Sequence, residues 1–166
     1  MRKINKRGEG AVGMSFGWIF SIILIVLFIF VAIYTIKSFL NMAHCTKVGS
    51  FYESLEENVR DAYGSSSSSF EMKIEIPGVE YVCFANLSEK ITGPIELYEE
   101  LMMYEGLDYN TFILPADKAC DMPARKVPYI NLTKTTRSKN PLCFDVSGGG
   151  SIRLVKEPYD RGVTIK

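Results

Sequence analysis

Cysteine and histidine are the side chains of this protein best suited to redox, nucleophilic or metal chemistry. The four cysteines, Cys45, Cys83, Cys120 and Cys143, are far apart in the sequence, and none belongs to a C-x-x-C motif. This spacing supports neither a thioredoxin-like redox motif nor a zinc ribbon. An even number of cysteines in a domain outside the cell instead favours two disulfides, for which three pairings are open. A metal site that combines His44 with reduced cysteines is the less favoured alternative.

The rest of the sequence offers no clear catalytic set. The single histidine, His44, would have to serve any Ser/His/Asp or Cys/His mechanism, yet no G-x-S-x-G motif is present. We interpret it as an exposed residue close to a membrane. The H-E-x-x-H, EF-hand and G-x-G-x-x-G motifs are also missing. We therefore predict a protein that is not an enzyme, with no catalytic residues, cofactor or metal, and keep a membrane-anchored enzyme as a distant alternative.

Two further patterns have simple interpretations. The glycines between Ser147 and Ser151 lack the lysine of a phosphate-binding loop, so we predict a hairpin loop between two strands. The tripeptides Asn86-Leu87-Ser88 and Asn131-Leu132-Thr133 match the acceptor pattern for N-glycosylation. Asn86 and Asn131 are therefore possible glycosylation sites on an extracellular domain.

A long apolar segment precedes the cysteines and His44 in the sequence. Residues 10–36 carry no charge, and residues 14–36 form a helix that rises roughly 34 Å, enough to cross the hydrocarbon of a bilayer. Four basic residues precede this segment, and acidic residues are frequent after it. Since basic flanks stay in the cytoplasm, we predict a single-pass protein of the cell membrane, with a cytoplasmic N-terminus and an extracellular C-terminal domain. Membrane lipid is thus one expected partner.

The N-terminus also resembles a known class of signal. Basic residues, Lys6-Arg7-Gly8, a short polar step and the apolar helix resemble the class III signals of type IV pilins and archaeal pilin-like proteins. The resemblance implies cleavage after Gly8, which leaves Glu9 as the first mature residue, and a helix that packs in a filament core. Gly13 stands where bacterial members carry a glutamate. The chain is also similar to small uncharacterised single-pass archaeal proteins. An uncleaved signal anchor is the preferred alternative.

A row of small residues lies along one face of the apolar helix. Gly13, Gly17 and Ser21 are spaced four apart, which is the small-xxx-small pattern that lets two helices approach closely. We therefore predict self-association through this face, with an incidental row as the alternative.

Charge argues against one class of partner. The chain has a formal net charge of zero, and the part from residue 38 onward has 14 Lys and Arg against 18 Asp and Glu. A nucleic-acid-binding domain would normally show a basic patch, so we predict no nucleic-acid partner.

The remaining pattern predicts an α+β fold with five parts. These are a cytoplasmic basic tip (residues 1–13), a transmembrane helix (14–36), an amphipathic stalk helix (37–63), a Ser-rich loop (64–69) and a disulfide-tied head (70–166). Apolar residues at spacings of three and four define the buried face of the stalk: Val48, Phe51, Tyr52, Leu55, Val59, Ala62 and Tyr63.

We expect the head to be mostly antiparallel sheet with one extra helix. Alternating residues 70–76, the turn Pro77-Gly78 and residues 79–84 predict a hairpin. Residues 93–105 predict a helix whose apolar stripe includes Tyr98, Leu101 and Met102 and whose glutamates face water. Short strands are expected near residues 129–132, 142–146, 151–156 and 162–165.

These features favour a membrane-anchored extracellular interaction or structural protein whose protein or cell-surface partner is unknown. The alternative function is a pilin-like filament subunit processed after Gly8.

Overall fold

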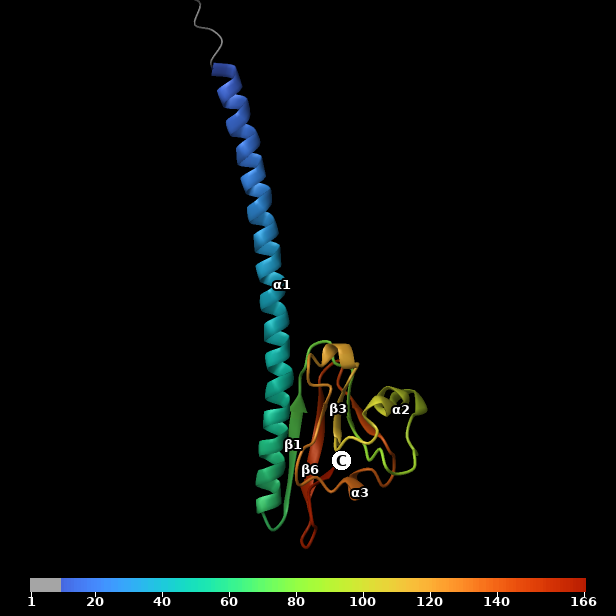
Figure 1. Ribbon diagram of the computed structural model, residues 1–166. Coiled ribbons are helices and arrows are strands. Elements are labelled where there is room, and N and C mark those ends of the chain that lie inside the picture. The colour runs from blue at the N-terminus through green and yellow to red at the C-terminus, as the bar shows by residue number, and fades with distance from the viewer. Residues whose placement is uncertain (1–9) are drawn as a thin grey trace, which may run out of the picture. The chain divides into compact units, whose positions relative to one another are not determined.

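The computed structural model describes residues 10–166, with side chains from residue 16 onward (Figure 1). The chain divides into two units, one ending at Met42 and one comprising Ala43–Lys166. Gly8 and Glu9 lie outside the described residues, as do the basic residues before them. Gly13 is described only as part of a helix backbone.

Helix α1 spans Gly10–Gly64 and contributes residues to both units. It runs without interruption through Gly49 because the residue sequence on both sides has few helix breakers. It ends where the serine run begins. There the backbone N–H and the hydroxyl of Ser65 both donate to the carbonyl of Ala62, at 3.2 and 2.7 Å, and so satisfy one of the free carbonyls at the helix end.

The second unit contains two antiparallel sheets, so the α+β fold class is confirmed. The first has the order β1 (Ser68–Ile74), β6 (Gly150–Lys156), β7 (Thr164–Ile165). The second has the order β4 (Ala124–Arg125), β3 (Thr111–Leu114), β2 (Tyr81–Phe84), β5 (Leu142–Asp145). The short helical elements are α2 (Ile95–Leu101), η1 (Met102–Tyr104), η2 (Ala116–Lys118) and α3 (Leu132–Thr135).

The main core lies between the C-terminal part of α1 and the sheets. Six of the seven residues predicted for the buried helix face are buried here: Val48, Phe51, Tyr52, Leu55, Val59 and Ala62. Met72 and Ile74 of β1 face them, because alternate residues of a strand point to the same side. Val82 and Phe84 of β2 join the same core from the second sheet. Tyr63 instead stays 41 % exposed and stacks on Tyr129.

A second, smaller core lies on the other face of the four-stranded sheet. Cys83, Phe112 and Leu114 point to this side and meet Tyr98 and Leu101 of α2. Figure 1 shows α2 on the side of the sheet remote from the C-terminal part of α1. Met102, which the sequence places in the apolar stripe of this helix, is 51 % exposed because η1 follows α2 and changes the helical periodicity.

Four local predictions differ from the structure. The turn at Pro77-Gly78 forms, but β1 pairs with β6 whereas β2 pairs with β3 and β5, so no hairpin joins β1 to β2. The glycine-rich loop after β5 likewise connects the two sheets and is no hairpin loop. Residues 129–132 form a single parallel bridge, Ile130 to Val163, and then enter α3. The Ser-rich loop is also shorter than predicted, because β1 begins at Ser68.

Leu55 tests how strongly the head depends on α1. The side chain is fully buried against the main core, so Leu55→Ala leaves a cavity and lowers the free energy of unfolding by about 3 kcal/mol. Urea unfolding of the full chain in detergent, followed by near-ultraviolet circular dichroism, measures the change. Glu57→Ala, at an exposed position of the same helix, is the control and changes stability little. Equal midpoints for the two variants would contradict the packing.

Candidate functional site

The most conspicuous surface of the chain is the apolar part of α1. Every described residue from 16 to 42 is exposed, including Phe20, Leu27 and Phe30 at 54, 51 and 69 %. In the part of the chain that the structure describes, one helix is both long enough and apolar enough to cross a membrane, and it contains these residues. The same helix buries its apolar face from Val48 to Ala62, so the two parts need different surroundings. Nothing within the first unit covers residues 16–42.

Two aromatic residues near the ends of the apolar segment were not singled out from the sequence. Trp18 and Tyr34 are 72 and 75 % exposed and lie 16 residues apart, which is roughly 24 Å along a helix. Tryptophan and tyrosine favour membrane–water interfaces because one end of each ring system is apolar and the other polar. A tryptophan and a tyrosine at such a spacing are typical of the two ends of a membrane-spanning helix. This pattern can be read from the sequence by measuring the distance between the two residues.

The apolar surface continues beyond Lys37. Phe39, Leu40 and Met42 are 70, 61 and 66 % exposed. From residue 16 to residue 42 the helix rises roughly 39 Å, whereas bilayer hydrocarbon is about 30 Å thick. The segment therefore has more apolar length than one bilayer crossing requires.

The predicted helix-packing face is open where the structure describes it. A Cβ atom added to Gly17 would meet nothing within 4 Å. The Ser21 hydroxyl donates to the Gly17 carbonyl at 2.9 Å, so its polar group is satisfied within the helix. Side chains at and around Gly13 lie outside the described residues. The prediction of self-association at this face stays a prediction.

The four cysteines form two disulfides, Cys45–Cys120 and Cys83–Cys143, which confirms the expected bonding. Cys83 and Cys143 lie directly opposite each other on neighbouring strands β2 and β5. Cys45, on α1, bonds to Cys120 in the loop after η2. Because every cysteine is paired, none is left to bind a metal with His44. Among the described residues, no group of three or more His, Cys, Asp and Glu side chains could hold a metal ion.

The sequence suggested that His44 is a freely exposed residue, but the structure shows it in a hydrogen bond. Its ring nitrogen Nε2 lies 2.6 Å from the carbonyl oxygen of Lys118 and therefore donates a hydrogen bond to it. This bond lies beside the Cys45–Cys120 disulfide, so both link the same segment of α1 to the same loop. The residue has a structural role in holding that loop.

A buried tyrosine is the most perturbed titratable group of the second unit. Tyr52 is fully buried and its hydroxyl has no hydrogen-bond partner. Burial raises the pKa of Tyr52 far above its ordinary value, and the opposing effect of the positive charge on Arg125 is smaller. Arg125 lies over the Tyr52 ring, with its Cζ 5.5 Å from the ring centroid, and its Nε is 2.8 Å from Glu56 Oε1. The cluster fastens β4 to α1 and contains no activated nucleophile or base.

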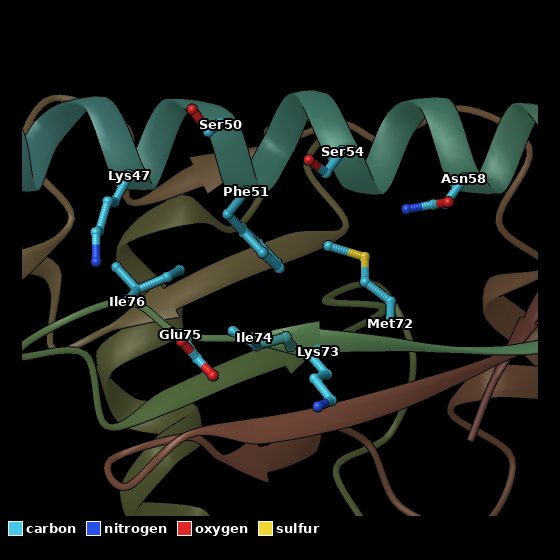
Figure 2. Close-up of a pocket in the computed structure, with 10 residues that line it drawn as sticks. All are labelled: Lys47, Ser50, Phe51, Ser54, Asn58, Met72, Lys73, Ile74, Glu75 and Ile76. Atoms are coloured by element: carbon cyan, nitrogen blue, oxygen red, sulfur yellow. The ribbon is translucent and has the colours of Figure 1, made fainter.

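A groove runs between α1 and the edge strand β1, with a volume of about 450 Å³. Figure 2 shows Phe51 of the helix and Met72 of the strand projecting into the space between them, while Lys73 and Glu75 point away from the helix. Ser50, Ser54 and Asn58 line the helix side. The lining combines apolar side chains with scattered polar groups.

The two glycosylation candidates both use their side-chain oxygen locally. Asn86 Oδ1 accepts from the N–H of Ser88, and Asn131 Oδ1 accepts from the N–H of Lys134 at the start of α3. In the described contacts neither Nδ2 donates a hydrogen bond. A glycan attached at Nδ2 would therefore leave both local hydrogen bonds in place.

Disulfide connectivity gives a direct prediction. Digestion of the full chain without reductant, followed by mass spectrometry of linked peptides, should return Cys45 joined to Cys120 and Cys83 joined to Cys143. Replacing Cys45 and Cys120 by alanine should lower the free energy of unfolding by about 2–5 kcal/mol, because the cross-link restricts the unfolded chain. The control is Ser54→Ala on the same helix, which changes no cross-link. Another pairing, or free thiols in native protein, would overturn the assignment.

No protein family model, curated protein or solved structure matches the chain. The described part of the chain combines an exposed apolar helix with a head that two disulfides close.

Proposed function

We propose that the chain is a single-pass protein of the cell membrane that displays its head on the outer side as an interaction or structural module. The observation that supports this most is the exposure of residues 16–36, an uncharged helix surface with no protein cover. Burying one large apolar side chain is worth roughly 1.5–3 kcal/mol, so a surface of this size is not stable in water. A bilayer supplies the missing apolar surroundings.

Two independent features favour an outward-facing head. Basic residues cluster before the apolar segment, and basic flanks remain on the cytoplasmic side. The head carries two disulfides, which persist on the oxidising side of a membrane. Charge and redox chemistry therefore agree on the same orientation.

A non-enzymatic role is part of this proposal. The most perturbed titratable group of the second unit is the buried Tyr52, which has a structural ring contact with Arg125. The groove beside β1 is lined by scattered polar groups on an apolar floor. We assign this groove to contact with a macromolecule.

The orientation can be tested with added cysteines. A cysteine at Glu57, exposed on the head side of α1, should react with a membrane-impermeant maleimide on intact cells. A cysteine at Lys3 should react only after the membrane is permeabilised, because the proposal places it in the cytoplasm. The unmodified protein, whose four cysteines are paired, is the blank for both. Reaction of the Lys3 variant on intact cells would contradict the orientation.

A pilin-like filament subunit is the second candidate function. One specific observation favours it, namely the exposed apolar surface of Phe39, Leu40 and Met42 beyond the length that a bilayer covers. In a filament, neighbouring helices would cover this surface. The arrangement of a long helix followed by an antiparallel head also resembles that family.

Processing separates the two candidates. If the chain is a filament subunit, the intact mass of protein from native membranes should lack residues 1–8, and a Gly8→Leu variant should keep them. If it is a signal-anchored protein, both forms should retain the N-terminus. Retention of residues 1–8 in a strain with an active pilin-type peptidase rules out the filament candidate and leaves the display function.

A further inference from the structure

The head carries an exposed apolar projection on the side of α2. Ile95, Met102, Met103 and Leu107 are 63, 51, 69 and 52 % exposed, and we call this set the methionine knob. Ile95 lies two helical turns before Met102, and the turn that brings Leu107 back is closed by its N–H donating to the carbonyl of Tyr104 at 3.1 Å. Exposed apolar patches on a folded surface mark contact sites, and methionine adapts readily to a partner.

Unpaired acidic residues surround the methionine knob. Glu96, Glu99, Glu100 and Glu105 are all exposed, and none forms an ion pair within residues 16–166. Glu100 is close enough to Tyr104 to add to the effect of burial, the larger cause, in raising the pKa of that phenol. The knob is thus an apolar centre with a negatively charged rim.

A second surface has the opposite character. A hollow of about 600 Å³ opens between α3, the start of β5 and β7, with Leu142 and Ile165 in its lining. Arg137 lies at this hollow, and Lys139 follows two residues later; both are exposed, and neither has an acidic partner in the described part of the chain. Lys134 and Lys166 also line the hollow. Lys134 forms ion pairs with Glu157 and Asp160, and Lys166 forms one with Glu157 at 3.9 Å. We call this surface the basic hollow.

We propose that the methionine knob of one copy docks into the basic hollow of a second copy. The apolar side chains of the knob would meet the half-buried Leu142 in the hollow, and the free carboxylates of the rim would face Arg137 and Lys139. Each copy carries both surfaces, one at α2 and the other at α3 (Figure 1). A contact that uses one surface of each copy leaves the other surface of each free, and such a contact repeats head to tail. A lipid surface fits the knob poorly, because anionic headgroups repel its rim.

The contact does not depend on the proposed membrane display, although anchoring would favour it. Copies held in one membrane have a high effective concentration, so a weak contact between heads can still assemble them. The charged rims set which surface recognises which, because like charges placed opposite each other are repulsive. The interaction should therefore weaken at high salt, where exposed charges are screened.

Charge reversal on each side tests the pairing. All proteins are full-length, in detergent micelles, and carry Gly17→Ile so that close packing of the membrane helices does not contribute. The first variant adds Glu99→Lys and Glu100→Lys, and the second adds Arg137→Glu and Lys139→Glu. Because all four positions are exposed, folding should be retained, which circular dichroism checks. Each variant alone should dissociate at least about tenfold more readily than the Gly17→Ile parent in sedimentation velocity.

An equimolar mixture of the two variants provides the decisive measurement. The reversed knob of the first then meets the reversed hollow of the second, and the unchanged surfaces also match, so association should return to the level of the parent. Glu57→Lys, a charge reversal at an exposed position of α1, is the control and should not alter association. Monomeric parent protein, variants that associate normally, or a mixture that stays dissociated would each overturn the proposal.

Discussion

The exclusion of apolar side chains from water governs both parts of helix α1. From Val48 to Ala62 the helix needs only one apolar stripe, because one side packs against the sheets and the other meets solvent. From residue 16 to 36 it is apolar on all sides, and no part of the first unit covers it. A helix that is apolar all round is stable only where its whole circumference is buried. The same driving force thus folds the head and requires apolar surroundings for the N-terminal segment.

The head is small, and its cross-links compensate for a modest core. Cys45–Cys120 closes a separation of 75 residues and joins α1 to the loop after η2, where His44 adds a hydrogen bond. Cys83–Cys143 joins β2 to β5 inside the four-stranded sheet. Both restrict the unfolded chain and so favour the folded one. The Cys45–Cys120 disulfide also fixes the start of the packed part of α1. Loss of this bond should therefore destabilise the main core.

Local patterns predicted those features that depend on neighbouring residues. The spacing of Val48, Phe51 and Leu55 identified the buried helix face, and the alternation of Met72 and Ile74 identified β1, because each pattern follows from the geometry of one element. The turn at Pro77-Gly78 also forms, with the N–H of Val79 donating to the carbonyl of Ile76 at 3.3 Å. The pairing of strands did not follow, since β1 finds its partner β6 about 80 residues away and local spacing says nothing of such contacts.

The surfaces of the head could not be predicted from local sequence patterns either. The methionine knob arises because η1 turns Met102 away from the stripe begun by Tyr98 and Leu101. The basic hollow combines α3 with the strands β5 and β7, and the cysteine pairing depends on the register between β2 and β5. Each requires segments that meet only in the folded chain. The spacing of Trp18 and Tyr34, in contrast, can be measured along the sequence without any knowledge of the folded chain.

Nitroxide accessibility in liposomes measures whether lipid surrounds residues 16–36. Spin labels placed one at a time along residues 18–40 report their collisions with oxygen, which dissolves in hydrocarbon, and with a nickel chelate, which stays in water. If lipid surrounds this segment, a label at Val26 is reached by oxygen and shielded from nickel, and the ratio of oxygen to nickel collisions falls towards Trp18 and reverses beyond Lys37. Equal nickel access at Val26 and at Glu57, in the packed part of α1, would contradict a lipid-surrounded segment.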